Sequence, residues 1–160
     1  MATREKATFG AGCFWGVEAA FRMVDGVTAT AVGYEGGHTE QPSYQDVCAH
    51  TTGHAEVVDV EFDPDRVGYE ELLGVFWANH DPTQMNRQGP DVGDQYRSVI
   101  FFHGDDQEKT ARASLEEEER SGRHRRPIVT QVVPAEVFWK AEDDHQQYLE
   151  KRGLAACRIL

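Results

Sequence analysis

The stretch "FGAGCFWGVEAAFRMV" at residues 9–24 decides the fold, because a strand-like segment turns into a helix-like one there. We expect residues 6–11 to form a short strand. The apolar residues that follow recur at three- and four-residue intervals, as on one face of a helix (Val17, Ala20, Phe21 and Val24). Glycines in the turn leave room for close approach of backbone or substrate (Gly10, Gly12 and Gly16). A strand, a glycine-rich turn and a helix are the start of an α/β arrangement.

The rest of the chain continues this alternation. Strands are predicted at 27–34, 54–63, 97–102 and 128–133, and helices at 68–79, 105–122 and 143–153. This order favours an α/β (α+β) two-layer sandwich with a mixed sheet, and it is compatible with a ferredoxin-like βαββαβ core. No repeat or linker interrupts it, so we expect one catalytic domain over residues 1–160 with a C-terminal tail from about residue 150. Residues 80–96 form a long polar loop, which is typical of functional or disordered segments.

The composition excludes several classes of partner. The 160-residue chain is 39% hydrophobic and has a formal net charge of -12, which argues against nucleic acid and anionic membrane surfaces. No apolar run approaches the ~20 residues that span a bilayer. The N-terminal "MATREKATFG" lacks the apolar centre of a secretory signal, so we expect a cytoplasmic protein. We also expect a monomer. The basic stretch "RSGRHRRP" at 120–127 is interpreted as a solvated loop, because the preceding "LEEEE" neutralises its charge.

Three cysteines, Cys13, Cys48 and Cys157, lie far apart in the sequence. There is no Cys-x-x-Cys pair, so neither a metal site nor a disulfide framework is predicted. In a reducing compartment an isolated cysteine is either a packed residue or a reacting one. We interpret Cys48 as a packed residue. Cys157 lies in a terminal segment that can carry a thiol to a distant partner, although a passive terminal cysteine is the alternative.

Cys13 is the candidate for a reacting thiol. It stands at the start of a predicted helix, where partial positive charge and free N–H groups stabilise a thiolate and lower the pKa of the cysteine. Phe14 and Trp15 can then wall an apolar pocket beside the sulfur. The alternative is a buried cysteine in a glycine-rich turn, with both aromatic residues in the core.

Glu56 is the candidate for an acid. Strand alternation in "HAEVVDVEFD" places it on one face with apolar residues (His54, Glu56, Val58, Val60 and Phe62). A carboxyl that faces a core loses hydration, its pKa rises, and it remains protonated near neutral pH. Two alternatives remain open, a glutamate at the solvated end of the strand and one paired with an arginine such as Arg97.

Tyr44 and Tyr96 are possible proton donors, and Asp91 follows Pro90 in a predicted turn. Taken singly, each is more often a packing or turn residue. A nucleophilic sulfur, an acid, an apolar pocket and a second thiol fit the two-electron reduction of an oxidised substrate such as methionine sulfoxide. Two other readings stay open. One is acyl transfer or amide hydrolysis by Cys13 with His54 or His80 as base, and the other is a non-catalytic regulatory domain.

Five stretches together resemble the A-type peptide methionine sulfoxide reductases, in the family's order and over nearly the whole chain. They are "GCFWG" at 12–16, "SYQDVC" at 43–48, "GHAEVV" at 53–58, "HDPTQMNRQGPDVGDQYRS" at 80–98 and "HQQYLEKRG" at 145–153. The resemblance implies a ferredoxin-like core and reduction of the S epimer of methionine sulfoxide, free or in proteins. It also implies no cofactor apart from an external thiol reductant such as thioredoxin.

The resemblance also implies a role for each matching residue. Cys13 would be the nucleophile, Phe14 and Trp15 the pocket for the methyl group, and Glu56 the acid. The oxygen-binding network would be completed by Tyr44, Asp91 and Tyr96. Cys157 would be the resolving thiol, with Cys48 as its rival, because the tail "RGLAACRIL" is shorter than in many members.

Overall fold

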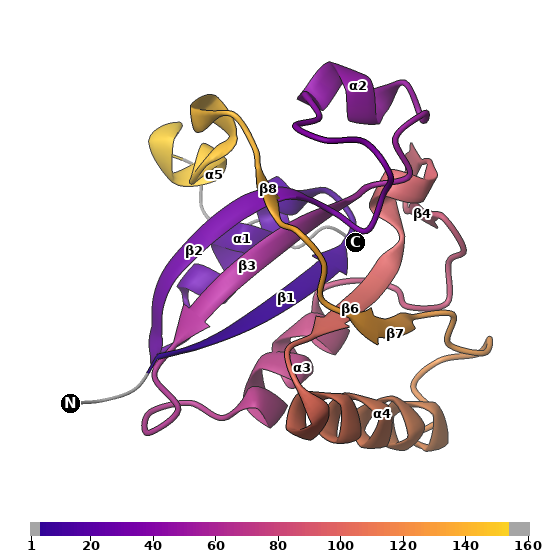
Figure 1. Cartoon of the computed structure of the whole chain (residues 1–160). Coiled ribbons are helices and arrows are strands. Elements are labelled where there is room, and N and C mark those ends of the chain that lie inside the picture. The colour runs from indigo at the N-terminus through magenta and orange to yellow at the C-terminus, as the bar shows by residue number, and fades with distance from the viewer. Residues whose placement is uncertain (1–3, 154–160) are drawn as a thin grey trace.

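A computed structural model describes residues 4–153 and shows a six-stranded mixed sheet covered by helices (Figure 1). The strands of this sheet are β1 (Glu5–Ala11), β2 (Val27–Glu35), β3 (Ala55–Phe62), β6 (Ser98–Phe102), β7 (Gln131–Pro134) and β8 (Trp139–Lys140). The helices are α1 (Phe14–Arg22), α2 (Tyr44–Cys48), α3 (Tyr69–Ala78), α4 (Asp105–Arg120) and α5 (Tyr148–Lys151). A small hairpin, β4 (Arg87–Gln88) and β5 (Asp91–Val92), and two 3₁₀ helices, η1 (Asp94–Tyr96) and η2 (Asp143–His145), complete the described elements.

The four central strands have the ferredoxin-like order. The sheet runs β7-β6-β1-β3-β2-β8, and β1 is antiparallel to both of its neighbours, β3 and β6. Helix α1 connects β1 to β2, and α3 follows β3 on the way to β6. The expected α+β fold with a βαββαβ core is therefore confirmed. Strand β7 extends the sheet parallel to β6, and β8 adds two antiparallel residue pairs to β2.

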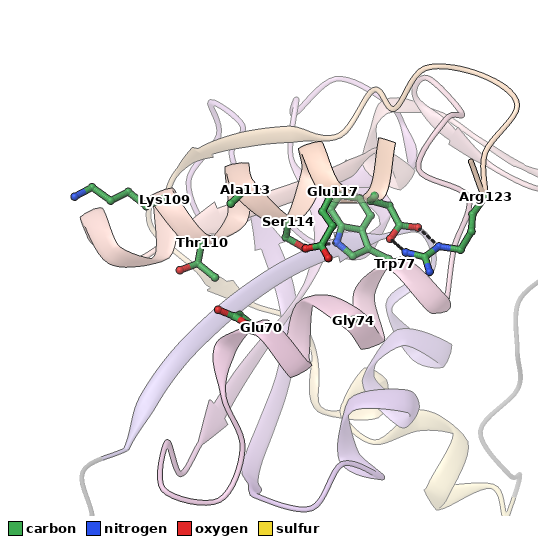
Figure 2. Close-up of a pocket in the computed structure, with 10 residues that line it drawn as sticks. Glu70, Gly74, Trp77, Lys109, Thr110, Ala113, Ser114, Glu117 and Arg123 are labelled. Atoms are coloured by element: carbon green, nitrogen blue, oxygen red, sulfur yellow. Dashed lines mark hydrogen bonds and ion pairs between the residues drawn. The ribbon is translucent and has the colours of Figure 1, made fainter. Parts of the chain in front are cut away.

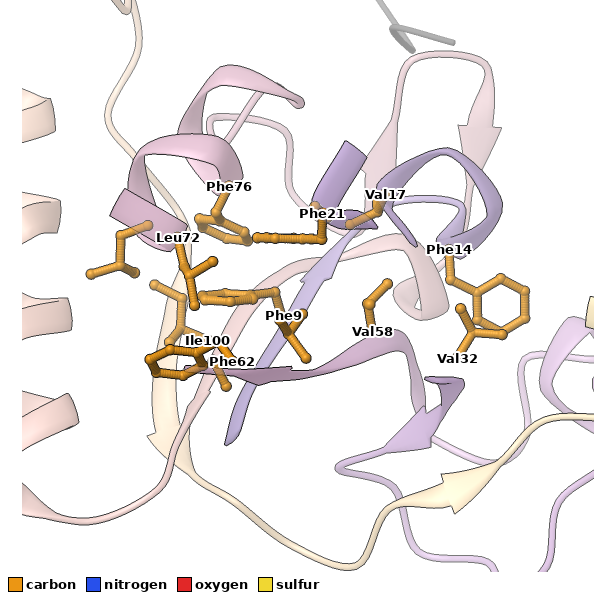
Figure 3. Close-up of a cluster of buried hydrophobic side chains, with 14 of the residues drawn as sticks. Phe9, Phe14, Val17, Phe21, Val32, Val58, Phe62, Leu72, Phe76 and Ile100 are labelled. Carbon is orange, nitrogen blue, oxygen red and sulfur yellow. The ribbon is translucent and has the colours of Figure 1, made fainter. Parts of the chain in front are cut away.

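The main core lies between the sheet and the helices (Figure 3). The Phe9 ring of β1 stacks on Phe21 of α1 at a centroid distance of 5.0 Å and contacts Phe76 of α3 at 5.3 Å. The alternation expected for β3 is observed, because Val58, Val60 and Phe62 all enter this core. The intervening residues face the other side of the sheet, where a second cluster forms (Ala55, Val57, Val99 and Phe101). Burial on both faces fixes the register of β3 and with it the direction of the Glu56 side chain.

The C-terminal part differs from the expected helix over 143–153. The helix is interrupted at Gln147, which has a left-handed backbone with φ of 49°. The Gln146 amide bonds both the backbone N–H and the carbonyl of Val32, at 2.8 and 2.9 Å. The backbone N–H of Gln147 donates to buried Glu18 at 2.8 Å. Gln146 therefore bonds β2 through its side chain, and Gln147 bonds α1 through its backbone N–H. The left-handed backbone at Gln147 is incompatible with a continuous helix.

None of the helices within residues 4–153 combines the length and apolar character needed to cross a membrane.

Gly12 carries the turn between β1 and α1. Its φ is +98°, and an added Cβ would lie 2.8 Å from Cγ of Gln88. We expect Gly12→Ala to lower the free energy of unfolding by about 2–4 kcal/mol, because backbone strain and overpacking add. Urea denaturation measures this loss. Gly104→Ala is the matched control, since φ is +90° there but no atom lies within 4 Å of the added Cβ. Equal losses in the two variants would show that the contact with Gln88 contributes nothing.

Candidate active site

Cys13 lies between the end of β1 and the first residue of α1. Its backbone is extended, with φ of -56° and ψ of 122°, so the helix begins at Phe14. The backbone N–H of Phe14 donates a buried hydrogen bond to Oε1 of Glu56 at 3.2 Å. One of the free N–H groups at the start of α1 is thus satisfied by a side chain from β3. This bond holds the thiol-bearing residue next to the carboxyl group.

Glu56 is buried, with 1% of its surface exposed. Burial raises its pKa to about 8, the Phe14 N–H acts in the opposite direction, and the charge of Asp91 raises it slightly further. Its second oxygen, Oε2, has no hydrogen-bond partner within residues 4–153. The expected inward direction and raised pKa are confirmed. Both alternatives for Glu56 are wrong, because it does not lie at a solvated strand end and Arg97 binds the carbonyls of Gly53 and Asp94 instead.

The thiol of Cys13 does not behave as the helix-start argument predicts. Burial, and then the charge of Glu56, raise the pKa of Cys13 to about 12. The backbone N–H groups of Trp15 and Gly16 do favour the thiolate, but their effect is smaller than that of burial. The expected lowering of the Cys13 pKa is therefore wrong for the free protein. At neutral pH both the thiol and the Glu56 carboxyl hold their protons.

The three candidate oxygen-binding groups approach this pair from three other elements. Asp91, in β5, is half-buried, and its charge raises the pKa of both Cys13 and Glu56. Burial, followed by the charge of Glu56, raises the pKa of Tyr96 in η1. Burial and interactions with Cys48 raise the pKa of Tyr44 at the start of α2, and Glu56 adds to this. Tyr44, Asp91 and Tyr96 therefore each interact electrostatically with Glu56.

Aromatic rings surround the start of α1. Trp15 is half-buried, and its ring stacks on Tyr148 with a centroid distance of 3.7 Å. Its indole N–H donates to Nδ1 of His145 at 3.0 Å, and the His145 ring lies 4.6 Å from that of Tyr44. Phe14 is fully buried and also belongs to the main core. The two candidate methyl-pocket residues therefore differ, since Trp15 keeps an open surface and Phe14 does not.

Several residues that support this cluster had no predicted function. The Tyr34 hydroxyl donates to one oxygen of Glu142 at 3.2 Å, and the other oxygen accepts from the backbone N–H of Tyr44 at 3.1 Å. His145 and Tyr148 hold Trp15 from the C-terminal segment. The signal that points to these last two residues in the sequence is the stretch "HQQYLEKRG". Nothing in the sequence pattern singles out Tyr34 or Glu142.

The two histidines weighed as bases for Cys13 are both occupied. The ring of His54 accepts from the Gly37 N–H and bonds the carbonyl of Thr39, at 2.9 and 2.7 Å. The ring of His80 bonds the carbonyl of Phe76 and the hydroxyl of Ser98, both at 2.7 Å. Neither imidazole therefore has a free nitrogen for a Cys–His mechanism, and the hydrolase interpretation loses its base.

The second described thiol, Cys48, lies near the tyrosines of this cluster. Cys48 ends α2, is half-buried, and lies close enough to affect the pKa of Tyr44 and Tyr96. Cys157 lies outside the described residues. Among residues 4–153 there is no group of three or more His, Cys, Asp or Glu side chains that could hold a metal ion.

Comparison with known proteins gives consistent matches over nearly the whole chain. The family model described as "Peptide methionine sulfoxide reductase" matches residues 5–160. The protein of Geobacter sulfurreducens named "Peptide methionine sulfoxide reductase MsrA" is 67% identical over 154 residues, which cover 96% of this chain and 95% of that protein.

Solved structures agree with this sequence match. Mxr1 from Saccharomyces cerevisiae in its reduced form superimposes with a TM-score of 0.89 at 35% identity, covering 97% of this chain and 89% of that one. Mxr1 in complex with Trx2 superimposes with a TM-score of 0.64 at 26% identity, covering 91% of this chain and 84% of that one.

Proposed function

The chain belongs to the peptide methionine sulfoxide reductase family, and from this premise we propose that Cys13 reduces the S epimer of methionine sulfoxide with Glu56 as the acid. The chain is an oxidoreductase that reduces methionine sulfoxide. One observation supports the proposed roles of Cys13 and Glu56. A buried carboxyl with a raised pKa and an unpartnered oxygen is tied to the residue that follows Cys13.

The first step is binding of the sulfoxide. Its oxygen accepts a hydrogen bond from the protonated Glu56, and in the proposal the phenols of Tyr44 and Tyr96, whose pKa values the charge of Glu56 raises, donate to the same oxygen. The methyl group packs against the aromatic rings near Trp15, with Phe14 behind them. A sulfoxide oxygen is a poor leaving group until it is protonated, so these donors prepare the S–O bond for cleavage.

The chemical step transfers oxygen and two electrons. The sulfur of Cys13 attacks the sulfoxide sulfur while Glu56 gives its proton to the oxygen. The thiol proton passes to the Glu56 carboxylate, which is thereby restored. The S–S bond formed by this attack then breaks and leaves its electron pair on the methionine sulfur, while the oxygen moves from that sulfur to the sulfur of Cys13. The products are methionine and a cysteine sulfenic acid. The step thus uses the proton of the Glu56 carboxyl and the proton of the Cys13 thiol, both of which the free protein holds at neutral pH.

Recycling requires a second thiol and an external reductant. In the proposed cycle the Cys157 thiol attacks the sulfenic acid, releases water and forms a disulfide with Cys13. A dithiol such as thioredoxin then reduces this disulfide, and no prosthetic group takes part. The solved complex of Mxr1 with Trx2 supports a thioredoxin as the reductant. Cys48 is the rival resolving thiol, since it lies near the same groups.

An epimer assay tests the proposed function. The two epimers of a methionine sulfoxide peptide are supplied separately with dithiothreitol, and methionine is quantified by chromatography. We expect complete conversion of the S epimer and none of the R epimer, because the donors to oxygen and the aromatic rings fix one handedness at sulfur. Conversion of the R epimer alone would contradict the proposal.

Cys157→Ser separates the chemical step from recycling. We expect one methionine per enzyme molecule in a single turnover, because attack by Cys13 does not need the second thiol. Thioredoxin-driven turnover should stop, since the disulfide that thioredoxin reduces no longer forms. Cys48→Ser is the control and should retain both activities. Recycling that persists in Cys157→Ser and is lost in Cys48→Ser would assign the resolving thiol to Cys48.

A further inference from the structure

We propose that a second cavity, which Cys13 does not line, binds a phosphate-bearing anion. It lies between residues 80–89, which follow α3, and residues 123–126, which follow α4. Its volume is about 630 Å³, within the range of small-molecule sites at roughly 300–1,000 Å³. Arg125 and Arg126 line it from one loop, and Asp81, Thr83 and Gln84 line it from the other.

The charge of the basic stretch is only partly neutralised. In α4, Glu116 pairs with Arg120 at 3.4 Å. Glu118 pairs with Arg123 at 2.6 Å, as the dashed lines to Arg123 show in Figure 2. Glu118 also accepts from His124 at 2.7 Å.

Arg125 and Arg126 are left without such partners. No ion pair or hydrogen bond of either guanidinium is found within residues 4–153. The expected solvated loop is observed, since Arg125 and Arg126 are exposed, but neutralisation by "LEEEE" does not extend to these two arginines as ion pairs. The chain as a whole has a formal net charge of -12, whereas these two arginines, unpaired within residues 4–153, place positive charge beside the cavity.

The one carboxylate that lines the cavity, Asp81, forms no ion pair with either arginine within residues 4–153 and is held by Thr83. Oδ1 of Asp81 accepts from the backbone N–H and the hydroxyl of Thr83, at 3.0 and 2.6 Å. The two adjacent guanidiniums thus remain for a ligand. A guanidinium presents paired N–H donors that match the oxygens of a phosphate. Two neighbouring guanidinium groups favour a ligand with more than one negative charge, so a phosphate or diphosphate group fits better than a single carboxylate.

The cavity shares a wall with the turn that carries Cys13. Gln88 lines the cavity, and its side chain bonds both the N–H and the carbonyl of Asp81 at 2.9 Å. The other side of Gln88 packs on Gly12, since a Cβ added there would lie 2.8 Å from its Cγ. A bound anion would therefore contact the residue that supports the catalytic turn from outside the active site.

Nuclear magnetic resonance on the full-length, ¹⁵N-labelled reduced protein tests this site. Inorganic pyrophosphate and ATP are titrated separately, with KCl holding the ionic strength constant. We expect saturable amide shifts concentrated in residues 80–89 and 123–126. Binding of pyrophosphate alone would identify a free inorganic anion as the ligand, whereas binding of ATP would identify a phosphate ester. Either result supports the site.

Charge-neutral variants decide whether the two arginines are responsible. The double variant Arg125→Gln/Arg126→Gln should weaken binding about tenfold or more, because each lost guanidinium removes charge-assisted hydrogen bonds. Arg120→Gln is the matched control, because it removes the same charge from the end of α4 but does not line the cavity. Since Arg125 and Arg126 are exposed, thermal unfolding and dithiothreitol-driven activity should be unchanged in the double variant. Absence of saturable binding, shifts centred elsewhere, or an equal loss in Arg120→Gln would overturn the proposal.

Discussion

Replacing Glu56 by glutamine is expected to slow methionine sulfoxide reduction by about 10²–10⁴-fold, the range typical of a lost general acid. The amide oxygen of glutamine can still accept the hydrogen bond from the Phe14 N–H, so the start of α1 keeps its anchor. What disappears is the acidic proton on the group that lies beside Cys13. The single-turnover rate of methionine formation measures this effect without contributions from recycling.

The pH profile gives a second readout of the same group. Burial raises the pKa of Glu56 to about 8, so the acid form is present below that pH and is lost above it. The wild-type rate should therefore fall as pH rises through about 8, whereas the residual rate of Glu56→Gln should lack this step. Glu35→Gln is the matched control. Glu35 is equally buried, burial raises its pKa to about 7, and it also accepts from a backbone N–H, that of Glu136. Equal rate losses in the two variants would contradict a specific role for Glu56.

Replacing Cys13 by serine should remove all measurable reduction of methionine sulfoxide. A hydroxyl is a far weaker nucleophile than a thiol and cannot form the sulfenic acid that carries the oxygen. Serine is close to cysteine in size, so the turn and the Phe14–Glu56 hydrogen bond should persist, as urea denaturation can verify. Methionine formation and trapping of the sulfenic acid with dimedone provide independent readouts.

Cys48→Ser is the control for this substitution as well. It removes a half-buried thiol near Tyr44 and should leave single-turnover reduction intact. Unchanged turnover in Cys13→Ser would refute the assignment of the nucleophile. It would also favour the reading in which Cys13 is a packed residue of the core.

Much of the fold could be predicted from the sequence. The two-residue alternation of β3 predicts the inward direction of Glu56, because a one-residue shift would send Val58 and Val60 to the wrong face. The alternation of strands and helices predicts the βαββαβ order, which the observed sheet confirms. The sequence motifs identify the family, and the family model over residues 5–160 confirms it.

Features that depend on distant contacts were not predictable. The pKa of Cys13 follows from how deeply other segments cover the thiol, whereas the sequence displays only the helix start that acts against this burial. The hairpin of β4 and β5 has two residues in each strand, too few for any periodicity to show. The link from Tyr34 through Glu142 to Tyr44 joins residues separated by about a hundred positions, and no local pattern marks it.

The side-chain amides of Gln146 and Gln147, which bond the backbone of β2, affect how the protein behaves in concentrated solution. Strand β8 covers only Gly33 and Tyr34 at the outer edge of the sheet. Next to them, Gln146 occupies the backbone groups of Val32, and Gln147 reaches the carbonyl of Thr30. An exposed strand edge is a template for association with other chains, and these amides block it without adding a full strand. Loss of this cover, in the variant Gln146→Ala/Gln147→Ala for example, should reveal itself as aggregation in concentrated solution.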